Sequence, residues 1–404
     1  MNIKLKLILM HFLEYAIWGA WLISLGSYLG GTLHFDGLQI GSFFATMGLA
    51  SLFMPGVMGA IADRVVPAQI VLGVCHLLSA IFMFVASTQQ DYVSLYVSIL
   101  LSVCFYMPTI SLSNAVSYNA MTKARLDPVV AFPPIRVWGT VGFIVSMITV
   151  DLMQVTQNSG QLIFSGILSI ILGLYSFTLP SCATNNNKSE KKSWVTYFGL
   201  EAFRLFKQRK IAIFLIFSMF LGMLLQITNA FANGYLTDFY GGQSIYKGTF
   251  GVEHANILIS LSQLSETLCI LMIPFFMKRY GIKIVMLISM LAWVLRFMFL
   301  GLGNPGDGLW LFILSMIVYG VAFDFYNISG SLFIEKETDS SIRSSAQGLF
   351  MIMTNGFGAF IGSYAAGYIV KVYDWPTSWF IFSGFALVVT VLFAIVFRYK
   401  HVQE

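Results

Sequence analysis

Apolar blocks of about 20 residues or longer recur along the whole chain, and this feature constrains the fold more than any other. A helix needs about 20 apolar residues to cross the ~30 Å hydrocarbon core of a bilayer. Hydrophobic residues make up 57% of the 404 positions and charged residues 10%, whereas soluble domains hold about 45–50% and about 25%. A soluble core cannot bury this much apolar surface, so the sequence predicts an all-α membrane protein that crosses the bilayer many times.

Twelve transmembrane helices are predicted when charged residues, Gly/Pro and polar clusters are taken as the ends of the apolar blocks. The first block follows Lys4 and Lys6, as in a signal peptide, but it runs to about Gly30 without a cleavage site and is interpreted as an uncleaved span. The predicted spans lie near residues 5–30, 39–62, 69–88, 92–120, 135–155, 161–180, 211–236, 254–277, 282–302, 309–334, 345–371 and 376–397.

Lys and Arg residues are distributed unequally between the two sets of loops, and the positive-inside rule assigns the richer set to the cytoplasm. The poorer set holds only Lys247 and Lys371. Both termini and the polar central stretch are therefore predicted to be cytoplasmic, in a bacterial-type inner membrane. The stretch divides the chain into an N-terminal six-helix bundle (1–180), a central loop (181–210) and a C-terminal six-helix bundle (211–404). Within the loop, Trp194–Lys210 is predicted to form an amphipathic helix on anionic lipid.

Several other functions are excluded by what the sequence lacks. The net charge of +5 does not indicate nucleic-acid binding, because the basic residues fall in short gaps between apolar blocks and topology explains them. The four cysteines have no paired spacing, so we expect neither a disulfide framework nor a metal site. No phosphate-binding loop, dinucleotide fingerprint or Ser/His/Asp set is present. We therefore expect no cofactor and no enzyme activity, and the driving force must come from a gradient or from the solute.

A short basic turn follows the second helix of each half. Residues 59–64 read Gly-Ala-Ile-Ala-Asp-Arg, and residues 278–283 read Lys-Arg-Tyr-Gly-Ile-Lys. The pattern resembles the signature loop of the major facilitator superfamily, although the first copy lacks the following Gly and basic pair and the second lacks the acid. With twelve spans, a division into six plus six and cytoplasmic termini, this resemblance implies the major facilitator superfamily fold and alternating access around a midplane site.

Charged residues inside predicted spans are candidates for function, because each costs at least ~2.5–3.5 kcal/mol on insertion scales. Glu266 lies midway along the eighth span with Gln263 one turn earlier, and the two could instead form a structural hydrogen-bond pair. Asp324 lies in an aromatic-rich segment of the tenth span. Loss of hydration favours the protonated form of such a carboxyl, which makes proton coupling chemically possible. The charged residues that lie deep within predicted spans are Glu14, Arg136, Glu266, Arg296 and Asp324.

Two further faces carry polar groups at helical spacing. Arg136, Thr140 and Phe143 stand at i, i+4 and i+7, so a cation, a hydroxyl and a ring share one face that suits a polar heterocycle or a sugar. Pro133 and Pro134 are expected to set the start of this span, which places Arg136 near its beginning. Alternatively to binding solute, Arg136 extends its head to the cytoplasmic surface. Gln226 and Asn229 share a face of the seventh span, where amides either hold helices together or bind solute; the sequence leaves both open.

Three other polar residues carry weaker signals. Glu14 is accompanied by aromatic residues and could join a central cavity, although it is only about two turns from the inner surface. Arg296 lies toward the outer end of the ninth span and is interpreted as structural. His76 is interpreted as a satisfied buried histidine rather than a proton relay.

Five blocks in order resemble the nucleoside:proton symporters of the major facilitator superfamily, and the likeness covers nearly the whole chain. The resemblance implies nucleosides and protons as partners, with proton coupling on Asp324 and Glu266. It also implies that a neutral amide is usual at the position of Glu14, so Glu14 is a departure. The blocks are residues 132–140, 225–229, 262–267, 319–325 and 345–348. The implied nucleoside-binding residues are Arg136, Thr140, Phe143, Gln226, Asn229, Gln263, Glu266, Tyr319, Phe323 and Asp324.

Three alternatives remain beside proton-coupled nucleoside uptake. The chain could transport another small polar solute, such as a sugar or a drug. It could bind a nucleoside as a sensor without moving it, although no sizeable soluble signalling domain is present. A membrane enzyme is the weakest option, because the buried acids lack a metal or nucleophile partner. Apart from the lipid bilayer no macromolecular partner is indicated, and a monomer is the default for this fold.

Overall fold

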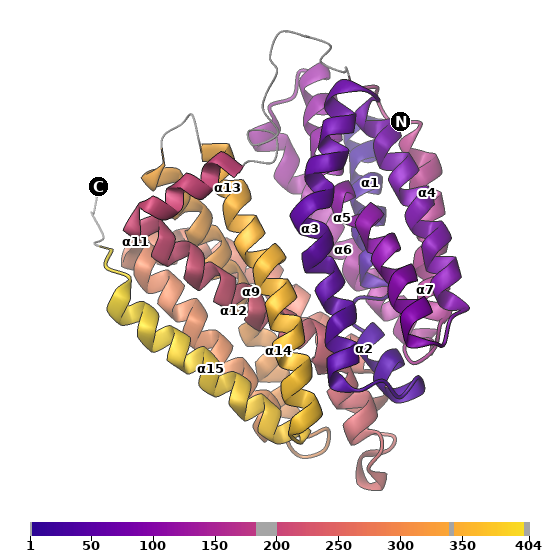
Figure 1. Cartoon of the computed structure of the whole chain (residues 1–404), viewed down its shortest axis with the longest axis vertical. Coiled ribbons are helices and arrows are strands. Elements are labelled where there is room, and N and C mark those ends of the chain that lie inside the picture. Colours follow the sequence, from indigo (N-terminus) through magenta and orange to yellow (C-terminus); the bar gives the residue numbers. More distant parts are fainter. Residues whose placement is uncertain (1, 183–199, 339–342, 400–404) are drawn as a thin grey trace. The chain divides into compact units, whose positions relative to one another are not determined.

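The computed structural model describes residues 2–182, 200–338 and 343–399, and its regular structure within these ranges is helical (Figure 1). The helices form two compact units. The first unit comprises Met1–Phe35 and Thr46–Phe198, and the second comprises Asp36–Ala45 and Gly199–Glu404. Each unit is described by itself below.

The helices of the first unit begin and end at recognisable polar or breaking residues. The Asn2 side chain caps α1 by accepting from the Lys4 backbone N–H, and Asp91 caps α5 by accepting from the N–H groups of Val93 and Ser94. The elements are α1 (Ile3–Gly19), α2 (Leu25–Ser27), the π-helix η1 (Tyr28–Thr32), α3 (Gly37–Arg64), α4 (Ala68–Ser87), α5 (Tyr92–Lys123), α6 (Pro128–Leu152) and α7 (Gly160–Ser176). The first residues of α3, 37–45, belong to the second unit.

The start of α6 differs from the prediction. The fifth span was expected to begin near residue 135, with Pro133 and Pro134 setting its start, but α6 begins at Pro128 and both prolines lie inside it. Proline is favoured at the first helical position because its missing N–H would be unpaired there anyway, and Pro128 fills that position. Interior prolines are tolerated in membrane helices, where neighbours satisfy the freed backbone groups. Arg136 therefore lies well inside the helix.

The second unit contains the remaining spans. Its elements are the 3-10 helix η2 (Leu200–Lys207), α9 (Arg209–Gly234), the π-helix η3 (Tyr235–Tyr240), the 3-10 helix η4 (Ser244–Tyr246), α10 (Phe250–Glu253), α11 (Ala255–Leu302), α12 (Leu309–Glu337), α13 (Arg343–Met351), the π-helix η5 (Ile352–Gly358), α14 (Ala359–Val372) and α15 (Trp375–Val396). Part of the predicted amphipathic helix, residues 194–199, lies outside the described residues. Its described part is the 3-10 helix η2.

Gly281 divides α11 into two spans. Its φ of 73° and ψ of 170° are non-helical and lie in a region that residues with a Cβ rarely adopt, so the chain breaks there. The break falls between the predicted spans 254–277 and 282–302.

All twelve predicted spans have helical counterparts in the described ranges. Nine helices are long and apolar enough to cross a membrane when α11 is counted once. The second part of α11 and the shorter helices α1 and α7 account for the other three. The expected all-α membrane fold with twelve spans is therefore confirmed.

Both six-helix series begin with the same irregularity. The first span ends in the π-helix Tyr28–Thr32 and the seventh ends in the π-helix Tyr235–Tyr240. π-helical turns are rare and are found mostly at functional sites. Their equivalent places in the first and seventh spans are those expected of a chain built from two related halves.

Glycines allow the helices that carry the predicted site residues to approach closely. A Cβ on Gly142 of α6 would lie 2.1 Å from the Phe12 carbonyl oxygen of α1. A Cβ on Gly320 of α12 would lie 2.5 Å from the Ser265 carbonyl oxygen of α11. Membrane helices associate through small residues of this kind. The pairs α1/α6 and α11/α12 are thereby held backbone to backbone.

Candidate functional site

In the first unit, Arg136 of α6 is stacked on Tyr15 of α1. The guanidinium carbon lies 3.9 Å from the centroid of the Tyr15 ring, and Tyr15 is only 8% exposed. A cation over an aromatic face is attracted by the ring quadrupole, most strongly where water is excluded. Gly139 makes room for the stack, because a Cβ there would lie 2.6 Å from Tyr15 Cδ2 and 2.8 Å from Arg136 Nη1. The Arg136 side chain is thus held against α1 rather than only extending to the cytoplasmic surface.

An aromatic corner adjoins this stack. The rings of Trp18 and Phe143 meet edge to face, with centroids 6.4 Å apart, and Trp18 is also 6.4 Å from Tyr15. Phe143 is buried and Thr140 is half-buried. The Trp18 indole N–H is buried and has no hydrogen-bond partner among the described residues. The α1/α6 pair therefore presents a cation, aromatic faces and an unused donor.

Glu14 belongs to a different environment, although it precedes Tyr15 in the chain. It is fully buried, and its Oε2 lies 2.9 Å from Nε2 of His76 on α4. Its Oε1 accepts a hydrogen bond of 2.6 Å from the Thr109 hydroxyl of α5. The interpretation of His76 as a satisfied buried histidine is confirmed by these contacts, and its partner is Glu14.

In the second unit, four of the predicted residues gather between α11 and α12. Asp324 is 4% exposed and interacts electrostatically with Glu266. Tyr319 is hydrogen-bonded to the Gln263 side chain and lies in the field of both carboxyls. Asp324 Oδ2 is buried and has no hydrogen-bond partner in the part of the chain that the structure describes. Two neighbouring carboxyls in such a place are costly to ionise together.

Arg296 lies against the same aromatic group. It is 2% exposed, and its guanidinium carbon lies 4.6 Å from the centroid of the Tyr319 ring. Its Nη1 donates a hydrogen bond of 2.7 Å to the Ser315 carbonyl, which ties the second part of α11 to α12. Tyr319 in turn stacks on Phe323, with centroids 5.8 Å apart and an interplanar angle of 6°. Arg296 is therefore a packing group of α11 and α12 that also fixes the Tyr319 ring.

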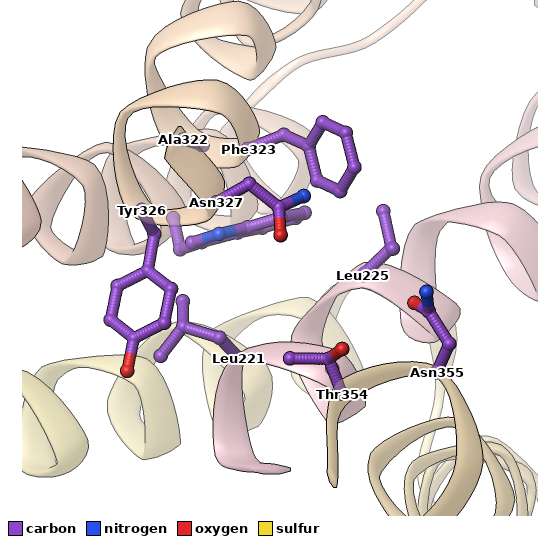
Figure 2. Close-up of a pocket in the computed structure, with 10 residues that line it drawn as sticks. Leu221, Leu225, Ala322, Phe323, Tyr326, Asn327, Thr354 and Asn355 are labelled. Atoms are coloured by element: carbon purple, nitrogen blue, oxygen red, sulfur yellow. The ribbon is translucent and has the colours of Figure 1, made fainter. Parts of the chain in front are cut away.

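A small pocket lies between α9, α12 and η5 in the second unit. Figure 2 shows Phe323 and Asn327 of α12 around the same space as Leu221 and Leu225 of α9 and Thr354 of η5. The pocket leaves about 20 Å³ in which the centre of a water-sized molecule can lie. This is room for a water molecule but not for a larger solute. Phe323 is the one predicted site residue among its lining groups.

The two amides of α9 lie close to the wall of this pocket along the chain, because Gln226 directly follows Leu225 and Asn229 lies about one turn further. Gln226 is 7% exposed, and its Oε1 has no partner among the described residues. Asn229 is half-buried. An unpaired buried acceptor is costly unless a partner arrives, so the Gln226 oxygen is suited to a solute hydroxyl or N–H.

Several residues around Arg136 and around the small pocket were not predicted from the sequence as parts of the site. Tyr15 and Trp18 were noticed only as neighbours of Glu14, although their spacing of three residues already places them on one helix face. Asn327 and Thr354 gave no signal, because the π-helix that positions Thr354 has no clear sequence signature. Among the described residues no three His, Cys, Asp or Glu side chains form a group that could hold a metal ion.

Comparisons with solved structures identify the class of protein. The fold is shared with a POT family transporter in complex with 5-aminolevulinic acid, at a TM-score of 0.71, 14% identity and coverage of 97% of this chain and 95% of the other. A crystal structure of nucleoside transporter NupG matches at a TM-score of 0.92 and 46% identity, covering 99% and 100% of the two chains. The chain thus has the fold of a multi-pass membrane transporter.

Sequence comparisons give the family. The family described as "Nucleoside H+ symporter" matches residues 1–402. Nucleoside permease NupG of Escherichia coli (strain K12) is 46% identical over 410 residues, covering 100% of this chain and 98% of the permease. The xanthosine permease of the same strain is 48% identical over 411 residues, with the same coverage. The chain belongs to the nucleoside H+ symporter family, as the resemblance in the sequence implied.

Proposed function

We propose that this chain carries nucleosides into the cell together with protons by alternating access. The observation that carries the proposal is the carboxyl pair of buried Asp324 and half-buried Glu266, which lies beside Tyr319 and Gln263 in a chain that matches the symporter family over residues 1–402. A transporter coupled to protons needs a group that changes its protonation without a permanent counter-charge. Asp324 fits, because it is buried with one oxygen unpartnered among the described residues.

Each unit contributes its own part of nucleoside recognition in this proposal. In the first unit, Arg136, Thr140 and Phe143 offer a cation, a hydroxyl and a ring. In the second unit, the amides Gln226, Asn229 and Gln263 satisfy ribose hydroxyls and base edges, while Tyr319 and Phe323 pack against the base. The buried Gln226 oxygen, which has no partner among the described residues, favours specificity, because a solute that lacks a matching hydroxyl or N–H leaves it unpaired.

The direction of coupling follows from charge. The doubly ionised state of Asp324 and Glu266 is disfavoured by the repulsion between the two carboxylates and by the burial of Asp324. Protonation of Asp324 or Glu266 from the outside relieves this cost and favours nucleoside binding, and release of the proton inside favours the return. We further propose an inner-membrane location with both termini cytoplasmic, supported by the Lys/Arg asymmetry of the loops. A monomeric unit is proposed as the default for this fold.

The test is uptake of radiolabelled uridine, adenosine and xanthosine into proteoliposomes with and without an inward proton gradient. Xanthosine is included because a xanthosine permease is among the similar proteins. Gradient-driven accumulation should be lost in Asp324→Asn, which keeps the size of the side chain, and reduced in Glu266→Gln. Exchange of labelled for unlabelled nucleoside needs no net proton movement and should persist in Asp324→Asn. Absence of nucleoside flux in the wild type under every gradient would refute the proposal.

A further inference from the structure

The acid and base that meet in the first unit form a closed group. Glu14 of α1 and His76 of α4 are both 0% exposed, and their Oε2 and Nε2 atoms lie 2.9 Å apart. The other carboxylate oxygen accepts from Thr109 at 2.6 Å. The other ring nitrogen, Nδ1, lies 3.3 Å from the Ser169 hydroxyl of α7. Every titratable atom of the pair therefore has a partner, and the partners outside the pair come from two other helices, α5 and α7.

The hydrogen-bond directions around His76 limit where protons can be. The Ser169 hydroxyl donates its own proton to the His76 carbonyl at 3.0 Å, so its oxygen must accept from the Nδ1–H of the ring. With Nδ1 protonated, Nε2 is either the acceptor of a Glu14 carboxylic proton or the donor to a Glu14 carboxylate. Both arrangements hold one proton between Oε2 and Nε2, and both leave all the hydrogen bonds satisfied.

The surroundings disfavour any other number of protons. Losing the shared proton leaves a net negative charge and two acceptors facing each other at full burial. Gaining a second proton leaves a net positive charge at full burial wherever it binds. Between Nε2 and Oε2 it makes two facing donors, and on Oε1 it turns the Thr109 hydroxyl toward the Tyr106 carbonyl, 2.5 Å away. Among the described residues, the Cys75 thiol of α4 and the Tyr106 phenol of α5 interact electrostatically with Glu14. Tyr106 in turn interacts with Tyr15 of α1 and Arg136 of α6, and Arg136 with His11 of α1. The α7 helix contributes the Ser169 hydroxyl. None of them is a carboxylate that could take over the role of Glu14.

The pair also fixes the position of α1. The Tyr106 hydroxyl donates a hydrogen bond of 2.7 Å to the Glu14 backbone carbonyl, in addition to the side-chain contacts. The residue after Glu14 is Tyr15, on whose ring Arg136 is stacked. An anchor at Glu14 therefore sets the rotation of the helix that positions this stack.

We propose that Glu14 and His76 together form a proton-binding site of the first unit, distinct from Asp324 and Glu266, which holds one shared proton throughout transport and anchors α1 to α4, α5 and α7. This site does not exchange its proton with either side of the membrane. The pair is electrically neutral and holds α1 in place, and the protons that move with the solute bind at Asp324 and Glu266.

The first test is a stability cycle on the purified full-length protein, which requires no transport. Glu14→Gln is the matched control, because its amide can donate to Nε2 and accept from Thr109 without any charge; its thermal unfolding temperature should stay close to that of the wild type. His76→Leu leaves a buried carboxyl without its base and should lower the unfolding temperature by many degrees or prevent folding. Combining the two substitutions should recover much of that loss.

Other outcomes of the cycle would overturn the proposal. If His76→Leu is as stable as the wild type, the pair is no anchor. If the double variant is no better than His76→Leu, or if both fail to fold, the unpaired charge is not the cause of the loss.

The second test separates this site from the proposed function, on which it depends only for the transport readout. In proteoliposomes, Glu14→Gln should keep the proton-to-nucleoside ratio and the pH profile of uridine uptake of the wild type. A lower ratio, or a shifted profile, would show that the pair releases its proton during the cycle and would overturn the proposal. A wild type that moves no nucleoside would refute the symporter function while leaving the stability cycle valid.

Discussion

The stack of Arg136 on Tyr15 gives a quantitative prediction about nucleoside affinity. Replacing Tyr15 with Leu keeps an apolar group of moderate size but removes the ring that holds the guanidinium, whose carbon lies 3.9 Å from the ring centroid. A cation–π contact contributes about 1 kcal/mol at an exposed site and about 2 kcal/mol when desolvated, and the 8% exposure of Tyr15 places this contact near the upper end. In the proposed binding role of Arg136, a freed side chain must be ordered again when solute binds, so this energy is lost from the binding free energy.

The expected change follows from the rule that about 1.4 kcal/mol is tenfold in affinity. Tyr15→Leu should therefore raise the uridine Kd by about 5- to 30-fold, as measured by titration calorimetry on the purified protein. Tyr15→Phe is the matched control, since it keeps the ring and removes only the hydroxyl, and it should bind within about 2-fold of the wild type. Wild-type affinity in a folded Tyr15→Leu protein would refute the reasoning. Equal losses in both variants would assign the effect to the hydroxyl.

Three further predictions concern close contacts and one charge pair. Gly139→Ala should weaken uridine binding about as much as Tyr15→Leu, because its Cβ would lie 2.6 Å from Tyr15 Cδ2 and displace the stack; binding titrations on the two variants check this. Gly320→Ala should cost about 1–3 kcal/mol of stability by forcing α12 away from the Ser265 carbonyl of α11, which a thermal unfolding scan would detect. Asp36 is partly desolvated, which raises its pKa, but hydrogen bonds from Lys371, 2.8 Å away, and from Gln39 outweigh this and hold the pKa below its usual range. A lowered carboxyl pKa stabilises the folded state above the unfolded pKa of about 4. The free energy of unfolding of the wild type should therefore exceed that of Asp36→Asn at neutral pH. The difference should stay below about 1 kcal/mol, because both side chains are more than a third exposed. It should disappear in unfolding scans as the pH falls through the lowered pKa of Asp36.

The amino-acid sequence predicted the fold well, because hydrocarbon thickness dictates span length directly. The division of α11 at Gly281 shows this. Two apolar blocks and a short basic turn in the sequence predicted two spans, although the backbone hydrogen bonds continue across the break and make α11 one long helix. The predicted start of α6 was wrong, because Pro133 and Pro134 were expected to begin the helix and Pro128 begins it instead. A proline pair inside a helix and a proline at its start have the same local composition, and only the tertiary environment distinguishes them.

Pairings between distant residues could not be read from the sequence. Helical spacing placed Gln263 and Glu266 on one face and Arg136 and Phe143 on another, because these depend on one helix alone. Glu14 and His76 are 62 residues apart, and nothing in either segment indicates the depth or rotation at which α1 and α4 meet. The contact of Tyr319 with Gln263 likewise depends on the approach of α11 and α12 that Gly320 permits.

The buried acids of the two units differ in what surrounds them, and that difference decides which can serve transport. Glu14 has a base on one oxygen and a hydroxyl on the other, so its most stable state holds one shared proton whichever side of the membrane is accessible. Asp324 has a second carboxyl as its electrostatic neighbour and an oxygen without a partner among the described residues. A carboxyl without a fixed base changes its charge when its hydration or its solute contacts change. This difference supports the proposed assignment of proton coupling to Asp324 and Glu266, and under that assignment the additional carboxyl at Glu14 need not change the number of protons moved.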